Sequence, residues 1–338
     1  MHAILIVRLG ALGDIVHTLP MTAALRARFP EARLDWLVDE RYLPLLDLVP
    51  VIDQRVAWRS RSRSLRQRIS ELKRMLSATP YDVALDAQGL IKSAVLASAS
   101  GASRVIGFTS DALREPLASW FYTETHRPDL SGHVIQKNLA LATALEASAG
   151  DPQFPLEIPD TPEVARLRAQ IDGAPYAVLN HGAAWSNKRW SPQRFGELAQ
   201  LLATRHDIRS VVTWGPDDRD RASAVVEAAS VAAVLAPATD IAALADVLRG
   251  ARLVVSGDTG PMHLAAALGT PVVALHGPTD PTRNGPWDSA DVAASRYEAC
   301  HCPQRRRCRQ AVSCLDELAT EAVAEAVATR LGAGEAGR

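Results

Sequence analysis

The chain is predicted to fold as two α/β domains, each built on a doubly wound parallel sheet. Three observations predict this fold class. Short apolar runs of strand length alternate with helical patterns along the chain, as they do in repeated strand–helix–strand units. A length of 338 residues suits two domains of ordinary size. Four prolines between Pro152 and Pro162 interrupt the alternation, because such a stretch continues neither a helix nor a central strand.

Residues 1–150 are expected to form the first domain. Its strands are expected at Ala3–Val7, Leu34–Val38, Val51–Ala57, Val83–Asp86 and Arg104–Gly107. Its helices are expected at Ile15–Arg28, Tyr42–Leu48, Leu65–Leu76, Ile91–Ser100 and Val134–Ala147.

Residues 151–162 are the expected linker, and 163–331 the second domain. Its strands are expected at Tyr176–Asn180, Ser210–Trp214, Val231–Leu235, Leu253–Ser256 and Val272–Leu275. Its helices are expected at Pro192–Arg205, Asp218–Ala229, Ile241–Arg249, Pro261–Leu268 and, at the C-terminus, Leu315–Leu331. Residues 332–338 are small and polar and are expected to be a flexible tail. Two such halves predict a ligand in the cleft between them.

The composition is that of a soluble globular protein, with 47% hydrophobic and 22% charged residues. A net charge of −1 gives no overall positive field, so nucleic acid is not an expected partner. The apolar N-terminal run breaks at Arg8 and Gly10, too early for a signal peptide. No apolar run approaches the roughly 20 residues of a membrane-spanning helix. A cytoplasmic protein is expected, with at most peripheral contact with a membrane.

The segment Val254–Pro281 carries the strongest functional signal. It predicts a buried strand, a polar turn, a short helix of small residues, a second buried strand and a loop rich in Gly and Pro. The turn Asp258-Thr259-Gly260 lies where the helix begins, and free backbone N–H groups at such a point can hold an anion such as phosphate.

Asp14 follows the first predicted strand, in the sequence Arg8-Leu9-Gly10-Ala11-Leu12-Gly13-Asp14. One interpretation is a strand-to-helix turn that Asp14 caps. The other is a general base, because a carboxylate at this strand end faces the expected cleft. The three-glycine dinucleotide fingerprint is absent, which disfavours an NAD-dependent oxidoreductase.

Three further polar clusters follow predicted strands. After one strand, Asp86 and Gln88 could bind sugar hydroxyls and Lys92 an anion, although an ordinary turn explains the spacing equally well. Lys188 follows another strand and could meet a phosphate. The acids after Trp214 could cap a helix or accept hydrogen bonds from a ribose diol.

Two segments have unusual compositions. Residues 55–74 hold eight basic residues and one acid, which predicts either an anion-recruiting patch or a solvated helix face. All the cysteines, Cys300, Cys302, Cys308 and Cys314, lie within fifteen residues. Their spacing is neither a secreted disulfide framework nor a standard zinc ribbon, so reduced loop thiols are expected, with a metal cluster as the alternative.

Four motifs together resemble the ADP-heptose:lipopolysaccharide heptosyltransferases of glycosyltransferase family 9, heptosyltransferase I type. They are Gly13–Pro20, Asp86–Ala94, Arg114–Tyr122, and Gly257–Gly260 with His263 and Gly277–Pro281. The first and last are typical of the broad family, and the middle two of the type I members. The resemblance runs along nearly the whole chain.

The resemblance implies a GT-B fold, in which two Rossmann-like domains face each other across a cleft. It implies an inverting transfer of L-glycero-D-manno-heptose from ADP-heptose to the 3-deoxy-D-manno-octulosonic acid of the lipid A inner core. Asp14 matches the family's catalytic base. The implied donor-binding residues are Lys188, Asp258, Thr259, Gly260 and His263. For the ribose the family usually has Glu, and here Asp217, Asp218 and Asp220 compete, of which Asp218 is favoured.

The acceptor is expected to contact Arg59, Arg61, Arg63, Gln88, Lys92 and Arg114. No cofactor and no metal are expected to be required, because a lysine and a helix N-terminus can replace a divalent ion at a diphosphate. The expected protein is a monomer on the cytoplasmic face of the inner membrane, with a nucleotide sugar and an anionic lipid as partners. The alternatives are a heptosyltransferase for a second core heptose or a protein hydroxyl, and a non-catalytic nucleotide-sugar-binding protein.

Overall fold

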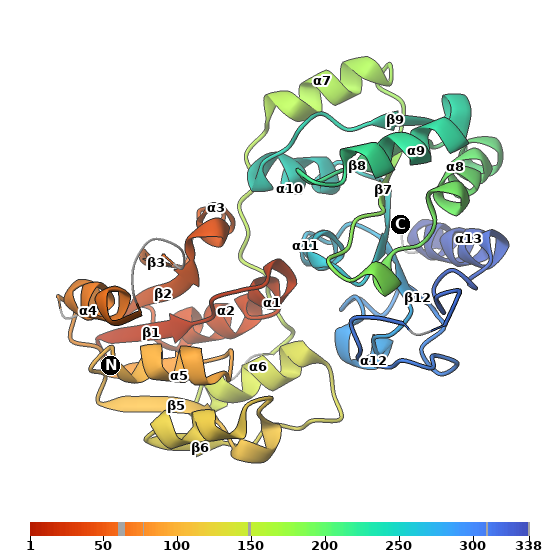
Figure 1. The fold of residues 1–338 in the computed structure, drawn as a ribbon. Coiled ribbons are helices and arrows are strands. Elements are labelled where there is room, and N and C mark those ends of the chain that lie inside the picture. Colours follow the sequence, from red (N-terminus) through yellow and green to blue (C-terminus); the bar gives the residue numbers. More distant parts are fainter. Residues whose placement is uncertain (60–64, 77, 148–149, 309, 337–338) are drawn as a thin grey trace. The chain divides into compact units, whose positions relative to one another are not determined.

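The computed structural model describes residues 1–59, 65–76, 78–147, 150–308 and 310–336. Its contacts divide the chain into two compact units, Met1–Glu157 and Ile158–Arg338 (Figure 1). The division falls within the proline-rich segment 151–162. No helix in these described ranges is long and apolar enough to cross a membrane.

The first unit is built on a six-stranded parallel sheet in the order β3-β2-β1-β4-β5-β6. The strands are β1 (Ala3–Val7), β2 (Arg33–Asp39), β3 (Gln54–Trp58), β4 (Val83–Asp86), β5 (Arg104–Phe108) and β6 (Glu124–His126). The central strand β1 is apolar and buried along its whole length, as expected of a parallel strand covered on both faces. Val7 at its end pairs with Asp86 at the end of β4, so the two carboxyl ends lie level.

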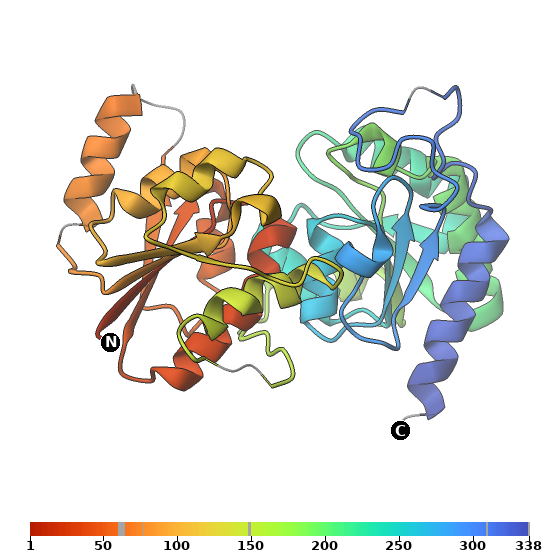
Figure 2. The ribbon, with the colours of Figure 1, turned by 90° about the horizontal axis from the view of Figure 1, so that it is seen from below.

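Helices cover both faces of this sheet. They are α1 (Leu12–Val16), α2 (Leu19–Arg28), α3 (Leu43–Leu46), α4 (Leu65–Leu76), α5 (Ile91–Ser98) and α6 (Val134–Thr143), with 3₁₀ turns η1 (Glu40–Tyr42), η2 (Ser110–Ala112) and η3 (Pro116–Phe121). Figure 2 shows α2 beside α6 on one face, and α5 beside η3 on the other. The single helix predicted at 15–28 is two helices, because Pro20 has no N–H and its ring would clash with the carbonyl one turn back.

The second unit repeats the architecture with the strand order β12-β11-β10-β7-β8-β9. Its strands are β7 (Tyr176–Asn180), β8 (Arg209–Thr213), β9 (Ala233–Leu235), β10 (Leu253–Gly257), β11 (Val272–His276) and β12 (Val292–Ser295). Its helices are α7 (Pro162–Gln170), α8 (Pro192–His206), α9 (Arg219–Ala229), α10 (Ile241–Arg249), α11 (Gly260–Ala267), α12 (Pro281–Asn284) and α13 (Thr320–Ala336), with η4 (Ser186–Lys188) and η5 (Ser230–Ala232). α8 packs against α9 and α13, and α10 packs against α7 and α11.

Both sheets have the same doubly wound order, read from opposite ends. In such sheets ligands bind outside the carboxyl ends of the strands at the point where the chain changes direction. That point lies between β1 and β4 in the first unit, and between β7 and β10 in the second. The strand order therefore selects two strand pairs at which to examine side chains.

The C-terminal predictions need correction. The helix predicted at 315–331 begins at Thr320 instead, because the preceding Leu318 carbonyl accepts hydrogen bonds from Trp190 Nε1 and Arg194 Nη1 and so belongs to the core contact with α8. Of the tail predicted at 332–338, the residues through Ala336 continue helix α13. Strands β6 and β12 were not predicted, because both are short and lack a buried apolar run.

Candidate functional site

A buried carboxylate follows β10 in the second unit. Asp258 is 7% exposed, and each oxygen of its carboxylate has a side-chain partner. Lys188 Nζ donates to Asp258 Oδ2 at 2.6 Å and to the Asp258 carbonyl at 3.3 Å. His263 Nε2, on α11, lies 3.0 Å from Asp258 Oδ1. The structure thus brings together Lys188, Asp258 and His263, which the sequence predicted as donor residues.

The charges around Asp258 keep it ionised. Burial alone would raise the pKa of Asp258, but the hydrogen bond with His263 and the nearby charges of His263 and Lys188 hold that pKa well below its usual range. Burial lowers the pKa of the neighbouring His276 to about 4, against the attraction of Asp258. At neutral pH His276 is therefore uncharged beside an ionised Asp258.

The N-terminus of α11 lies beside this carboxylate. Thr259 is the N-cap residue and Gly260 begins the helix, with no side-chain bond to cap it. Thr259 Oγ1 instead accepts a hydrogen bond from Asn180 Nδ2 at 3.0 Å, and Asn180 also donates to Ser256 Oγ at 2.8 Å. This network ties the ends of β7 and β10 together and leaves the first turn of α11 without a side-chain acceptor, as an anion site requires.

The position of Lys188 depends on a glycine. A Cβ on Gly257 would lie 2.8 Å from the Lys188 carbonyl oxygen, so η4 approaches β10 as closely as it does only because residue 257 has no side chain. The ammonium of Lys188 also lies 4.7 Å from the centroid of the Trp185 ring. Sequence reasoning identified Lys188 but not these two supports.

Asp218 is the acid after β8 that faces the strand ends. A Cβ on Gly182, which follows β7, would come within 3.0 Å of Asp218 Oδ2. Asp218 is half-buried, whereas Asp217 and Asp220 are exposed. Burial lowers the pKa of the nearby His181 to about 4, and Asp218 opposes that shift.

Several buried polar atoms at this end of the second sheet have no hydrogen-bond partner among the described residues. They are both ring nitrogens of His181, His276 Nε2, Thr279 Oγ1 and Asn187 Oδ1. Buried polar groups are normally paired, so unpaired ones gathered at strand ends indicate a site for ligand or water. Sequence reasoning assigned none of these four residues a role of its own, because the sequence does not show which buried polar atoms lack a hydrogen-bond partner.

In the first unit, Asp14 is held at the end of β1. Its side chain is 45% exposed, and Arg8 Nη2 lies 2.8 Å from Asp14 Oδ1. The Ala11 N–H donates to Asp14 Oδ2 at 3.0 Å. Arg8 itself is buried and also donates to the Ala87 carbonyl after β4. The carboxylate is therefore oriented by two donors but still open to a reactant.

Gln88 and Asp86 shape the same strand end. Gln88 Oε1 accepts a hydrogen bond from the Leu9 N–H at 2.7 Å, so it joins the β4 loop to the β1 loop. Asp86 is fully buried, and burial raises its pKa although Tyr122 and Ser93 donate to it at 2.8 Å each. Asp86 supports the loops, whereas a sugar-binding group would need an accessible oxygen.

The other predicted acceptor residues lie at or near the same edge of the first sheet. Lys92, at the start of α5, is exposed and lies 5.2 Å from the centroid of the Trp58 ring. Arg114 is exposed between η2 and η3. Arg59 follows β3 and lies 3.9 Å from Glu40. Arg61 and Arg63 lie outside the described residues.

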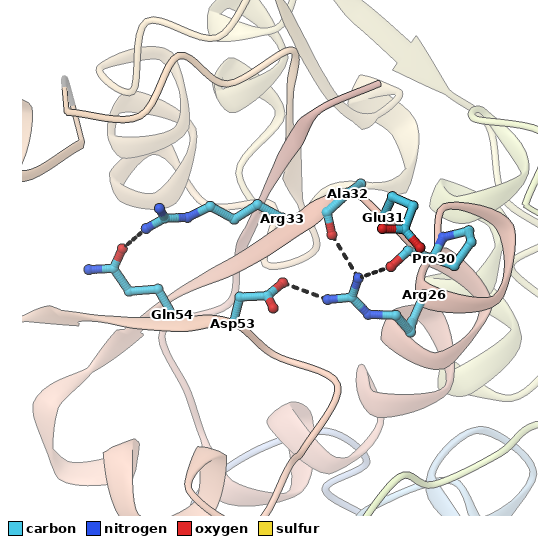
Figure 3. A pocket seen from close by; sticks show the side chains of 7 residues that line it. All are labelled: Arg26, Pro30, Glu31, Ala32, Arg33, Asp53 and Gln54. Carbon is cyan, nitrogen blue, oxygen red and sulfur yellow. Dashed lines mark hydrogen bonds and ion pairs between the residues drawn. The ribbon is translucent and has the colours of Figure 1, made fainter.

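A hollow of about 570 Å³ lies at the opposite edge of the same sheet, at the amino ends of β2 and β3. Figure 3 shows its two arginines turned onto neighbouring groups. Arg26 donates to Asp53 and to backbone carbonyls, and Arg33 donates to Asp35 and Gln54. Because its cations are already paired, this hollow does not compete with the strand-end sites.

The cysteines lie together in the loop before α13. Cys300, Cys302 and Cys314 are buried, and the half-buried Cys308 packs against them. Cys300 Sγ lies 3.7 Å from Cys302 Sγ and 3.2 Å from Cys314 Sγ. Burial and the neighbouring Cys300 thiol raise the pKa of Cys314 to about 12. As the described side chains are placed, no group of three or more His, Cys, Asp or Glu residues could hold a metal ion.

Two doubly wound units with polar clusters at their strand ends have the architecture of the GT-B fold. The model of glycosyltransferase family 9 (heptosyltransferase) matches residues 69–312. The chain belongs to glycosyltransferase family 9, the heptosyltransferases, and is a glycosyltransferase.

Curated relatives and solved structures agree with this assignment. Lipopolysaccharide heptosyltransferase 1 of Pseudomonas aeruginosa is 36% identical over 300 residues, which cover 86% of this chain and 82% of the relative. The Escherichia coli K12 protein of the same name is 33% identical over 289 residues, covering 82% of this chain and 88% of the relative. The E. coli heptosyltransferase WaaC, solved with ADP, superimposes with a TM-score of 0.78 at 28% identity, covering 97% of this chain and 99% of that one.

Proposed function

We propose that this chain transfers L-glycero-D-manno-heptose from ADP-heptose to the 3-deoxy-D-manno-octulosonic acid of the lipid A inner core, with inversion at the anomeric carbon. One observation carries the donor half of this proposal. Lys188, ionised Asp258 and the uncapped N-terminus of α11 converge at the β7–β10 switch point, where a diphosphate would meet N–H groups and an ammonium. The heptosyltransferase 1 relatives support the choice of sugar and acceptor.

Lys188 is the proposed group that stabilises the leaving ADP. An ammonium has three N–H donors, and Asp258 accepts two hydrogen bonds from it. The remaining donor and the α11 dipole can balance the negative charge that grows on the diphosphate as its bond to the anomeric carbon breaks. This chemistry needs no divalent metal or other cofactor. Asp258 and His263 are proposed to hold Lys188 in place, and Asp218 to accept hydrogen bonds from the ribose.

Asp14 is the proposed general base. It takes the proton of the acceptor hydroxyl as that oxygen forms its bond to the anomeric carbon from the side opposite ADP. Arg8 and the Ala11 N–H fix one geometry of the carboxylate, and its partial exposure leaves room for the hydroxyl. A single base acting with direct displacement gives inversion.

The anionic lipid acceptor is proposed to meet the basic side chains near the carboxyl edge of the first sheet, Arg59, Lys92 and Arg114. We further propose that the protein acts as a monomer in peripheral contact with the cytoplasmic face of the inner membrane. Arg61 and Arg63 are included in this proposal from sequence alone.

The direct test is to incubate the purified full chain with ADP-heptose and a lipid A acceptor that carries 3-deoxy-D-manno-octulosonic acid but no heptose. The expected result is release of ADP and a mass increase of the acceptor by one heptose. A mass increase only on an acceptor that already carries one heptose would reassign the acceptor. ADP-heptose binding without transfer to either acceptor would reject the catalytic function.

A further inference from the structure

In the loop that precedes α13, the buried side chains are mainly cysteines. Residues 296–308 and 310–319 contain neither helix nor strand, and so long an irregular segment is uncommon in a compact domain. Between positions 296 and 313, apart from residue 309, the only buried side chains are Cys300 and Cys302. Cys314 follows, and Cys308 lies at the edge of the same cluster. A segment without an apolar core needs another stabilising interaction, such as a disulfide or a bound metal ion.

The sulfur positions are close to those that a tetrahedral thiolate site requires. A Zn–S bond of about 2.3 Å in a tetrahedron separates two sulfurs by roughly 3.8 Å. The Cys300–Cys302 distance of 3.7 Å matches that value, and the Cys300–Cys314 distance of 3.2 Å is somewhat shorter. Both distances far exceed the roughly 2.05 Å of a disulfide.

Donors around the cluster are arranged to stabilise charge on sulfur. The Cys302 N–H donates to Cys300 Sγ at 3.4 Å, within the Cys-x-Cys step. Asn187 Nδ2 lies 3.7 Å from Cys302 Sγ and donates to the Arg305 carbonyl at 2.9 Å. Arg305, Arg306 and Arg307 are exposed in the same loop and would offset the net −2 charge of a divalent ion bound by four thiolates.

We propose that Cys300, Cys302, Cys308 and Cys314 bind one divalent ion of the zinc class as a closed, structural site. Binding releases the four thiol protons to solvent and forms four metal–sulfur bonds without any redox step. Ligation requires the Cys300–Cys314 pair to open by about half an ångström and Cys308 to turn inward, since metal binding and loop closure occur together.

The site would steady the loop next to Lys188. Asn187 lies one residue before Lys188, is buried, and connects η4 to the cysteine loop. The Gln304 N–H also donates to the Pro278 carbonyl at 2.7 Å, after β11. Because Lys188 is the proposed ligand of the donor diphosphate, this consequence rests on the proposed function, whereas metal binding itself does not.

The test measures metal in the full chain, purified under reducing conditions without a metal-affinity step from cells supplied with zinc and iron. The expected result is one equivalent of metal per chain by elemental analysis, and the intense visible absorption of tetrahedral thiolate cobalt after exchange with Co²⁺. Cys300→Ser, Cys302→Ser, Cys308→Ser and Cys314→Ser should each lose the metal. The matched control, His301→Ala, changes an exposed residue between two ligands and should keep it.

A second measurement on the unmodified chain avoids variants that fail to fold. Thiol alkylation followed by mass spectrometry should find all four cysteines protected before metal is stripped and all four reactive afterwards. Absence of stoichiometric metal, with reactive thiols or a Cys300–Cys314 disulfide, would overturn the proposal. Loss of metal from His301→Ala would also overturn it, because the four thiolates would then not be the ligand set. Neither result depends on whether heptose is transferred.

Discussion

The carboxylate of Asp14, the proposed base, is held by two groups, the Arg8 guanidinium and the Ala11 N–H. Asp14→Asn keeps the size of the side chain but removes its ability to accept a proton. We expect kcat to fall by about 10²- to 10⁴-fold with the affinity for ADP-heptose unchanged. Turnover kinetics and calorimetric donor titration measure the two quantities. Asp47→Asn, which alters another carboxylate paired with an arginine, should leave both unchanged, and near-normal turnover of Asp14→Asn would exclude the role.

Lys188 is expected to contribute to donor binding through its charge. Lys188→Ala should weaken ADP binding by about 10- to 100-fold, the effect of losing a hydrogen bond to a charged group. Calorimetry measures the affinity. Thermal unfolding must be followed in parallel, because the substitution also removes the ammonium that faces buried Asp258, whose carboxylate then keeps its contact with His263. An unchanged ADP affinity in a folded variant would contradict the diphosphate role.

The sequence predicted the members of the donor cluster better than their supports. The motifs predict Asp258, Lys188 and His263 as donor-binding residues, and in the structure both other side chains contact Asp258. Arg8, the partner of Asp14, was read as the end of an apolar run, and Asn180 as part of a strand. Which way a side chain at a strand end turns depends on the neighbouring strand, and strand order is not visible in a single sequence.

At the scale of elements, the packing of α8 on α9 depends on Gly196. A Cβ there would lie 2.4 Å from Ala228 Cβ and 2.7 Å from its backbone carbon. We expect Gly196→Ala to lower the free energy of unfolding by about 1–3 kcal/mol, because the two helices must separate. Chemical denaturation measures the change.

The matched control is Gly332→Ala in α13, where nothing lies within 4 Å of the new Cβ. This change should stabilise the protein by about 0.5–1 kcal/mol through helix propensity alone. If both substitutions had the same effect, close helix contact would not be the reason for Gly196.

Element boundaries were predictable where a strand is buried on both faces. β1, β4 and β7 have the predicted bounds, because each is a short, mostly apolar run of strand length that is buried along its whole length. The start of α13 was misplaced, because the Leu318 carbonyl is bound by side chains far away in sequence. The helix α7 was missed, because it begins at the last proline of the stretch taken as linker, at a position where proline is tolerated.

At the scale of the whole molecule, two buried histidines predict an acid-sensitive second unit. Folding holds the pKa of His181 and His276 at about 4, below the 6.5 of an unfolded histidine. Between pH 6.5 and pH 4 the unfolded chain therefore binds more protons, and stability falls as pH falls. The low pKa of each histidine should lower the free energy of unfolding by roughly 2 kcal/mol as the pH falls from 7 to 5.

Denaturant unfolding at a series of pH values measures this slope. His276→Asn should flatten it, whereas the control His206→Asn, at the half-buried C-terminal end of α8, should not. A slope that is equal in both variants would assign the acid sensitivity to other groups.

The reaction as a whole is expected to proceed without added divalent ions, because Lys188 and the α11 N-terminus supply positive charge at the leaving group. Turnover with EDTA and without Mg²⁺ or Mn²⁺ should equal turnover with them. The metal content of the cysteine loop is followed in the same samples, since a closed thiolate site is expected to resist this treatment. Activity lost on chelation and restored by Mg²⁺ would contradict the proposed leaving-group chemistry.

The distribution of tryptophans has a practical consequence. All seven are described, and only Trp120 on η3 is exposed, at 80%, whereas Trp36, Trp58 and Trp190 are fully buried. A water-soluble quencher should therefore act on this one indole more than on the others. η3 is anchored to the start of α5 through Glu115, which accepts the Ile91 N–H at 2.8 Å. The native emission of the unlabelled protein thus contains a built-in fluorescent reporter beside the residues proposed to meet the lipid.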